Sequence, residues 1–299
     1  MLVLALAPAA VSSVGCTGDD DGPAADAPDD PSGLSTTTTS STTTTTLASP
    51  AEAAPPGGSA EAARRITAIE RALRDPATPA GVLPSLGWQQ QVIYRALAGN
   101  PTWHAEVLAA VPADVATIVT ANVGGGSSIA RLVEPPAQLP ATWRIVTPPP
   151  PATLLGFYRE AEAASGIPWP YLAAINLVET RMGRIVGDSS AGAQGPMQFI
   201  PSSWRAHGRG GDVHDPRDSI LAAGRYLAVA GGPADMRKAI FAYNHSDAYV
   251  DAVTRYASVM AADERAYLGY YHWQVSYRTV EGLYLLREGY PEVAAVRLG

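Results

Sequence analysis

The chain has 299 residues, of which 46% are hydrophobic and 16% are charged, enough for one ordinary domain or two small ones. The formal net charge of −7 comes entirely from the acids before residue 60, which are Asp19, Asp20, Asp21, Asp26, Asp29, Asp30 and Glu52. The remaining chain is neutral and lacks the basic footprint of a nucleic-acid-binding protein, so nucleic acid is excluded as a partner.

The chain begins with MLVLALAPAAVSSVGC, a short apolar run that ends in small residues. This pattern predicts a signal peptide over residues 1–15. Cys16 is the only cysteine, which excludes an intramolecular disulfide and a thiolate metal cluster. Its setting resembles a bacterial lipobox, in which the cysteine is diacylated and becomes the mature N-terminus, although Ser13 stands where Leu is usual and no Lys or Arg precedes the run. Two acyl chains would anchor the protein stably, and the alternatives are plain secretion or an incidental buried cysteine.

Residues 16–59 are predicted to form a disordered tether. From residue 17 they contain neither an aromatic nor a basic residue, and they include the run STTTTSSTTTTT at 35–46. Such a composition cannot bury enough apolar surface to order itself, and Ser, Thr and Pro tracts of this kind are typical of extended, O-glycosylated stalks.

Residues 60–147 are predicted to form a helical region that ends in a proline-rich linker. Ile66, Ile69 and Leu73 recur at helical spacing, and later segments repeat the pattern between Gly, Asn and Pro stops. The stretch VGGGSS at 123–128 follows no strand and has no Lys, so we interpret it as a hinge rather than a phosphate loop. The segments VEPPAQLP and TPPPPAT then stiffen the passage into the next domain.

Residues 148–299 are predicted to form the main domain, which makes the fold class mainly α. One helix ends at Gly166, and another begins with Asp215 as its cap and Pro216 in its first turn. From Gly269 the sequence alternates and is rich in aromatic residues, which predicts a short strand or hairpin extension. No later stretch reaches the length of a membrane span.

One acid stands out in a helix around residues 171–182. Leu172, Ile175 and Glu179 share one face of that helix, and the face is otherwise apolar. Burial there would raise the pKa of Glu179 and keep it protonated, as a general acid requires. The alternative is a Glu near a helix end that turns outward and pairs with Arg181 or Arg184.

A glycine-rich polar loop follows, running from Gly183 to Gln198. Its backbone amides and short hydroxyls suit a polyol substrate, and the Gln198 amide can both donate and accept hydrogen bonds. Met197 and Phe199 offer apolar surface either to a sugar face or to the core.

These blocks together resemble the lysozyme-like lytic transglycosylases, which carry the domain named after the soluble lytic transglycosylase. The matching residues are Glu179, then SSAGAQGPMQFIPSSW from Ser189, then DPRDSILAAGRYL, then AYN at 242–244. Their order and spacing follow the pattern E…S-x-x-G-A-x-G-x-M-Q…A-Y-N, and the resemblance covers about residues 153–262.

The resemblance implies an α-rich lysozyme-like fold and cleavage of the β-1,4 bond between N-acetylmuramic acid and N-acetylglucosamine in peptidoglycan, with 1,6-anhydro ends as product. Glu179 would be the single acid and base. Ser189, Met197 and Gln198 would bind substrate. Tyr243 would orient Glu179 or the sugar, and Asn244 would support the cleft. His245 departs from the small residue that commonly follows this Tyr-Asn pair. No cofactor is implied, and we expect a monomer at the cell envelope, anchored to the outer face of the cytoplasmic membrane through Cys16.

Three alternatives compete with this interpretation. Asp188, nine residues after Glu179, could hold a water and make the enzyme a muramidase-type hydrolase. A non-catalytic wall-binding lipoprotein could keep the same fold. A metal site is the third, and we predict none, because the spacing of its candidate ligands matches no familiar site; these are His207, Asp212, His214 and Asp215.

Overall fold

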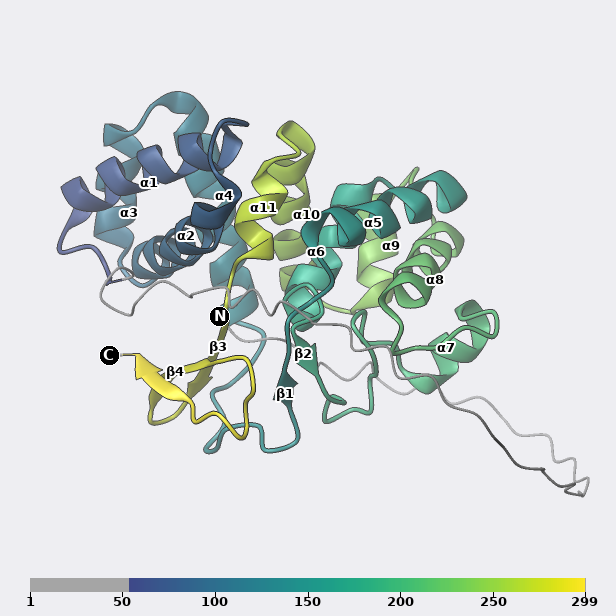
Figure 1. The fold of residues 1–299 in the computed structure, drawn as a ribbon. Helices are drawn as coiled ribbons and strands as arrows, with labels where there is room; N and C mark the ends of the chain where they lie inside the picture. Colours follow the sequence, from purple (N-terminus) through teal and green to yellow (C-terminus); the bar gives the residue numbers. More distant parts are fainter. Residues whose placement is uncertain (1–53, 299) are drawn as a thin grey trace, which may run out of the picture. The chain divides into compact units, whose positions relative to one another are not determined.

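The computed structural model describes residues 54–298, and these are mainly α-helical, as predicted (Figure 1). The predicted signal peptide, Cys16 and nearly all of the predicted tether lie outside the described residues. The helices are, in chain order, α1 (Ser59–Arg74), the single 3-10 turn η2 (Ala80–Val82), α2 (Leu83–Ala98), α3 (Pro101–Ala110), α4 (Ala113–Ala130), α5 (Pro151–Ser165), α6 (Trp169–Thr180), α7 (Pro201–His207), α8 (Pro216–Val229), α9 (Met236–Tyr243), α10 (Asp247–Ala262) and α11 (Ala266–Tyr271).

The N-terminal helices pack through the apolar faces that their spacing predicts. Ile66, Ile69 and Leu73 are all buried, on the side of α1 that faces the core. Helix α1 contacts α2, α3 and α11, and α2 contacts α4 and α11. The predicted helical region is therefore confirmed as helical, and it rests directly on elements from the C-terminal half of the chain.

The glycine-rich stretch at 123–128 is not a hinge, and that prediction is wrong. It lies within α4, which packs along α10. A Cβ at Gly124 would stand 2.8 Å from the Arg255 guanidinium, and one at Gly125 would stand 2.9 Å from the Tyr256 ring. The glycines are therefore there to let two helices approach closely, a demand that outweighs their low helix propensity.

Within residues 54–298 the strands form two small sheets. β1 (Arg144–Ile145), in the proline-rich passage, pairs antiparallel with β2 (Ile185–Val186), which follows α6. At the C-terminus β3 (Val275–Thr279), β4 (Gly282–Leu286) and β5 (Val296–Leu298) form an antiparallel sheet in that order. The predicted C-terminal hairpin is thus confirmed.

The second half of the chain builds around α6, which contacts α5, α8, α10 and α11. The predicted helix ends here are confirmed: Gly166 closes α5 in the left-handed conformation, and the Asp215 carboxylate accepts a hydrogen bond from the Asp218 N–H at the start of α8. Helix α10 contacts both α4 and α6, so it joins the N-terminal helices to the helix that carries Glu179 (Figure 1).

The main apolar core of the described residues runs from Ala62 in α1 to Trp273 after α11, and two smaller apolar clusters lie around the strands. The predicted division of the chain near residue 147 stays a prediction. Within residues 54–298 no helix has the length and apolarity to cross a bilayer.

Candidate active site

Glu179 lies one residue before the end of α6 and is only 4% exposed. Every residue from Leu172 to Thr180 is buried, so the helix delivers its acid into the protein interior. Burial raises the pKa of Glu179 to about 8, and a hydrogen bond from the Tyr249 hydroxyl opposes that rise. The carboxyl is consequently protonated at neutral pH, which is the state that a general acid needs.

The ion pair considered for Glu179 in the sequence is absent among the described residues. No Lys or Arg lies within 4.0 Å of its carboxyl oxygens. Arg181 is instead buried beside the Trp273 ring, with its guanidinium carbon 5.8 Å from the ring centroid, and Arg184 lies over Tyr271 at 5.5 Å. No neighbouring cation therefore favours the ionised form of Glu179.

The chain leaves α6 through a strained turn. Arg181 and Met182 both have positive φ, at 57° and 63°, before Gly183 at 84°. Non-glycine residues seldom adopt this conformation, and two in succession persist only where the surroundings hold them. Two hydrogen bonds end on the carbonyl of Pro196, one from the Asn176 amide at 2.8 Å and one from the Thr180 hydroxyl at 2.5 Å.

These bonds tie the end of α6 to the polar loop, so that Glu179 and the loop form one unit. Close packing fixes the loop from its other side. A Cβ at Gly195 would stand 1.9 Å from the Val213 carbonyl oxygen, so only glycine fits there.

Ser189 organises the polar loop from within. It is 8% exposed, and its hydroxyl oxygen accepts hydrogen bonds from the backbone N–H groups of Ala191, at 3.1 Å, and Ala193, at 2.9 Å. The hydroxyl proton is not used in these bonds. Ser189 can therefore shape the loop and still donate one hydrogen bond to a substrate.

Gln198 and Met197 lie at the end of the loop, next to an isolated bridge between Gln194 and Phe199. Gln198 has a positive φ of 52°, and its amide donates to the Gly195 carbonyl at 2.9 Å. The Met197 side chain is fully buried, which favours the core role over the sugar-facing role among the two expected for it.

Tyr243 and Asn244 stand at the end of α9, beside the same loop. The Tyr243 hydroxyl donates a 2.6 Å hydrogen bond to the Met197 carbonyl, so it holds the loop rather than the acid. Burial, and then the nearby Glu179, raise the pKa of Tyr243 well above its usual value. Asn244 ends the helix and is half-buried, while His245 is exposed and its ring stands 5.6 Å from that of Phe241.

The hydrogen bond to Glu179 comes from Tyr249, which the sequence reasoning missed. Tyr249 lies in the first turn of α10, is fully buried, and donates to Glu179 Oε1 at 2.6 Å. The signal for it was weak: Tyr249, Val253 and Tyr256 share one apolar helix face, and a buried Tyr hydroxyl requires a partner. The sequence does not indicate which residue that partner is.

Asp188 is exposed at the start of the loop. Its carboxylate accepts a long hydrogen bond of 3.5 Å from the Gln194 amide, and among the described residues it forms no ion pair. Residues 54–298 hold no group of three or more His, Cys, Asp or Glu side chains placed to bind a metal ion.

Comparison with known proteins gives one family. Residues 157–265 match the family model described as "Transglycosylase SLT domain", a span that contains α6, the polar loop, α9, α10 and both Glu179 and Tyr249. No curated protein and no solved structure matches the chain.

Proposed function

Because residues 157–265 form a lysozyme-like transglycosylase SLT domain, we propose that the protein is a peptidoglycan lytic transglycosylase in which Glu179 serves first as general acid and then as general base. The domain assigns the protein to peptidoglycan, and so to a place outside the cytoplasm. The finer proposal is supported by the surroundings of Glu179: its carboxyl is buried, and no Lys or Arg of residues 54–298 lies within ion-pair distance of it. Burial raises the pKa of Glu179 to about 8, which favours the protonated form at neutral pH.

We infer the reacting oxygen of Glu179 from its hydrogen bond with Tyr249. The Tyr249 hydroxyl donates a hydrogen bond to Glu179 Oε1, so Oε1 acts as the carbonyl oxygen of the carboxylic acid. The acidic proton of Glu179 then lies on Oε2. In the first step Oε2 gives its proton to the glycosidic oxygen, and the C1–O bond electrons leave with the N-acetylglucosamine side. The substrate's own N-acetyl group stabilises the cationic centre at C1.

The second step closes the ring. The Glu179 carboxylate removes the proton from the 6-hydroxyl of the same muramic acid, and that oxygen forms a bond to C1. The product is a 1,6-anhydro end, and Glu179 is protonated again for the next cycle. No water is consumed, which is why one carboxyl suffices where glycosidases ordinarily use two.

The polar loop supplies the remaining contacts. Ser189 has one hydroxyl proton to donate, and Gln198 ends the same loop, where its amide donates to the Gly195 carbonyl. We assign both to the sugar and its acetyl group. Tyr243 and Asn244 act by holding the loop and the floor of the cleft, Tyr243 through its bond to the Met197 carbonyl.

A second candidate is a muramidase-type hydrolase, and the position of Asp188 favours it. The carboxylate is exposed, lies on the loop that follows Glu179, and is free to orient a water. The two candidates differ in their product. A transglycosylase leaves anhydro ends, whereas a hydrolase adds water and leaves reducing muramic ends.

The test is to digest purified peptidoglycan and analyse the released fragments by mass spectrometry. We expect anhydro ends from the wild type, their loss in Glu179→Gln, and wild-type release from the matched control Glu162→Gln, which removes an acid of α5 in the same domain. Reducing ends that vanish in Asp188→Asn would establish the hydrolase instead. Binding to wall sacculi without any released fragment would overturn both and favour a non-catalytic binding protein.

The predicted anchor is a separate proposal, since Cys16 lies outside the described residues. We propose that Cys16 is lipidated and that the Thr-rich tether carries the domain from the membrane into the wall. Metabolic labelling with a fatty acid should mark the wild type and not Cys16→Ser, and globomycin should block processing. A labelled Cys16→Ser protein would contradict the proposal.

A further inference from the structure

A cavity of about 470 Å³ lies where α2, α4, α10 and β3 meet. None of Glu179, Ser189 and Gln198 lines it, so it is distinct from the candidate active site. Its volume falls in the range of about 300–1,000 Å³ that is usual for small-molecule sites. Gly126 and Ser127, from the glycine-rich stretch of α4, form part of its wall.

Three arginines line this cavity, and no acid does. Arg95, Arg131 and Arg278 form no ion pair within residues 54–298. Arg95 donates to the Ser276 hydroxyl at 2.8 Å, and Arg131 donates to the Ser128 hydroxyl at 2.9 Å. Each of these bonds uses one N–H, so most guanidinium donors stay available to a ligand.

Keeping Arg95 charged costs free energy, because burial removes water from its guanidinium group. Desolvation, and then the nearby Arg278, lower its pKa to about 10. A partly desolvated cation without a counter-ion destabilises a fold, and such an arrangement is typical of a site that receives an anion.

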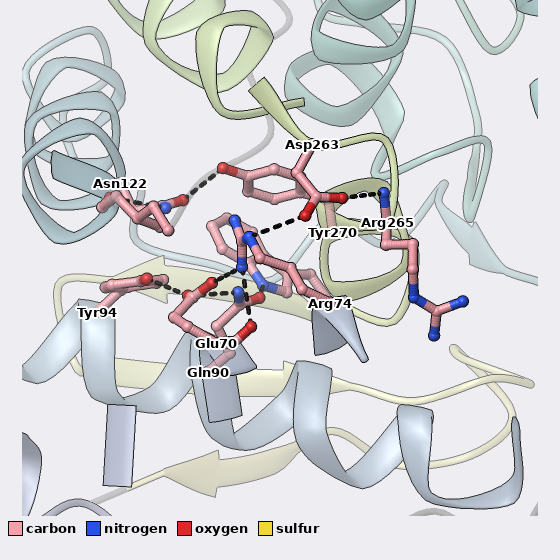
Figure 2. A network of polar contacts seen from close by, with 10 residues as sticks. Glu70, Arg74, Gln90, Tyr94, Asn122, Asp263, Arg265 and Tyr270 are labelled. Carbon is pink, nitrogen blue, oxygen red and sulfur yellow. Dashed lines mark hydrogen bonds and ion pairs between the residues drawn. The ribbon is translucent and has the colours of Figure 1, made fainter. Parts of the chain in front are cut away.

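Two acids beside the cavity lining are already bound to other groups. Glu70 pairs with Arg74 and accepts hydrogen bonds from Gln90, at 2.8 Å, and from Tyr94 (Figure 2). Asp251 of α10 pairs with Arg255 at 2.8 Å and accepts a 2.6 Å hydrogen bond from the Ser128 hydroxyl, through which it reaches Arg131. Asp251 therefore compensates part of the charge of Arg131, whereas the charged neighbour that acts on Arg95 is another cation, Arg278.

The aromatic wall of the cavity is fixed in advance. The Trp273 indole N–H donates to the Gln90 amide oxygen at 2.8 Å, which links the wall to the Glu70 network. Asn122, which also lines the cavity, accepts a 2.8 Å hydrogen bond from Tyr270 (Figure 2). A preformed wall spares a ligand the cost of ordering it.

We propose that this cavity binds a short peptide that bears carboxylates. Arginine forks match carboxylates in two-point contacts, and the apolar lining from Tyr94, Trp273 and Val133 suits small apolar side chains. The cavity has room for two or three small residues. The source we infer, a peptide carried on the wall glycan, rests on the proposed function.

The test is a titration of the full-length Glu179→Gln protein, which separates binding from cleavage. The probe is acetyl-Ala-Glu-Ala with free carboxylates, and its matched control is the uncharged acetyl-Ala-Gln-Ala carboxamide. Calorimetry should show one saturable site for the acidic peptide, with at least about 10-fold weaker binding of the carboxamide. Trp273 places a fluorescent reporter in the wall.

Variants then locate the site. Arg278→Gln should weaken acidic-peptide binding about 10-fold, and because Arg278 is exposed this variant keeps the fold even if Arg95→Gln does not. Arg71→Gln, an exposed arginine of α1 that does not line the cavity, should bind as the parent does.

Several results would overturn the proposal: no saturable binding, equal binding of the carboxamide, or equal losses in Arg71→Gln and Arg278→Gln. Inorganic phosphate that displaces the peptide at matched concentration would show an unspecific anion site. If joint substitution of Asp19, Asp20 and Asp21 by Asn tightens peptide binding, the acidic N-terminal segment competes with the peptide. The cavity would then be a binding site for that segment of the same chain. If the protein releases anhydro products but does not bind the peptide, the peptide site is wrong and the proposed function stands. If it binds the peptide but releases no product, the proposed function is wrong and the peptide site stands.

Discussion

Among residues 54–298 two glutamates are buried, and their surroundings are opposite. Glu70 in α1 is 1% exposed and Glu179 in α6 is 4% exposed. Glu70 pairs with Arg74 and receives further hydrogen bonds from Gln90 and Tyr94 (Figure 2). Glu179 receives a hydrogen bond from Tyr249, and no cation in the part of the chain that the structure describes lies within ion-pair distance of it.

The difference in partners indicates a different role for each of the two glutamates. Glu70 is held in an ion pair with Arg74 and joins α1, α2 and, through Gln90, the Trp273 side chain, so its contribution is to structure. Glu179 is left without charge compensation, so it keeps its proton at neutral pH and can give that proton to a substrate. Equal burial therefore produces a structural acid in one place and a reactive acid in the other.

The largest expected effect is on activity, from Glu179→Gln. Loss of the acid should lower the rate of fragment release by at least ~10²–10⁴-fold, as is usual for general acid catalysis. Glu70→Gln should stay within a few-fold of wild type per folded molecule. Rates that fall equally in the two variants would remove the distinction.

The pH dependence of stability should separate Glu179→Gln from the wild type next. The pKa of Glu179 is about 8 in the folded state and near 4.5 when unfolded. Between those values the folded state holds a proton that the unfolded state has lost, so the free energy of unfolding falls as pH rises, by about 1.4 kcal/mol per unit from this group.

Glu179→Gln lacks this term and should gain stability relative to the wild type from pH 5 to pH 8. Urea unfolding of both proteins across that range measures the difference. A constant difference at every pH would mean that Glu179 is ionised in the folded protein.

Glu70→Gln should reduce stability by about 1–3 kcal/mol at neutral pH. The change keeps the shape of the side chain but removes the charge that Arg74 pairs with. Arg74 is 19% exposed and lies 3.7 Å from Asp263, which moderates the loss. Chemical denaturation measures it, and an unchanged midpoint would show that the network does not support the fold.

The smallest effect should come from Tyr249→Phe. The Tyr249 hydrogen bond lowers the pKa of Glu179, so its removal should raise that pKa and move the alkaline limb of the kcat/KM profile to higher pH. The lost positioning should also cost roughly 2- to 10-fold in rate. Tyr270→Phe is the matched control, because it removes a buried Tyr hydrogen bond to Asn122 and leaves Glu179 untouched. A limb that shifts equally in both variants would contradict the assigned role of Tyr249.

Much of the fold follows from local patterns in the sequence. The spacing of Ile66, Ile69 and Leu73 predicts the buried face of α1, and Asp215 and Gly166 mark helix ends correctly. The error at 123–128 has a physical cause: glycines break isolated helices, but here the close approach of α10 requires them. That requirement comes from a contact more than a hundred residues away, so no local pattern reveals it.

The candidate site also has a part that the sequence predicts and a part that it does not. The sequence predicts the apolar face that leads to Glu179 and the loop of small residues after it. Glu70 also lies on a buried face, four residues after Ile66 and three before Leu73, which was a usable signal. The sequence does not predict the hydrogen-bond partners of the two acids. Tyr249, the partner of Glu179, and Gln90, a partner of Glu70, come from other helices and are brought close only by tertiary packing.

Whether Glu179 carries a proton at neutral pH can be read from the titration of its own carboxyl group. Label the glutamates with ¹³C at the carboxyl carbon, assign the Glu179 signal by its absence in Glu179→Gln, and follow its chemical shift from pH 4 to pH 10. Because the pKa of Glu179 is about 8, we expect a single transition of its signal near pH 8. A signal that shows the ionised carboxylate throughout the neutral range, with its transition below pH 5, would contradict it.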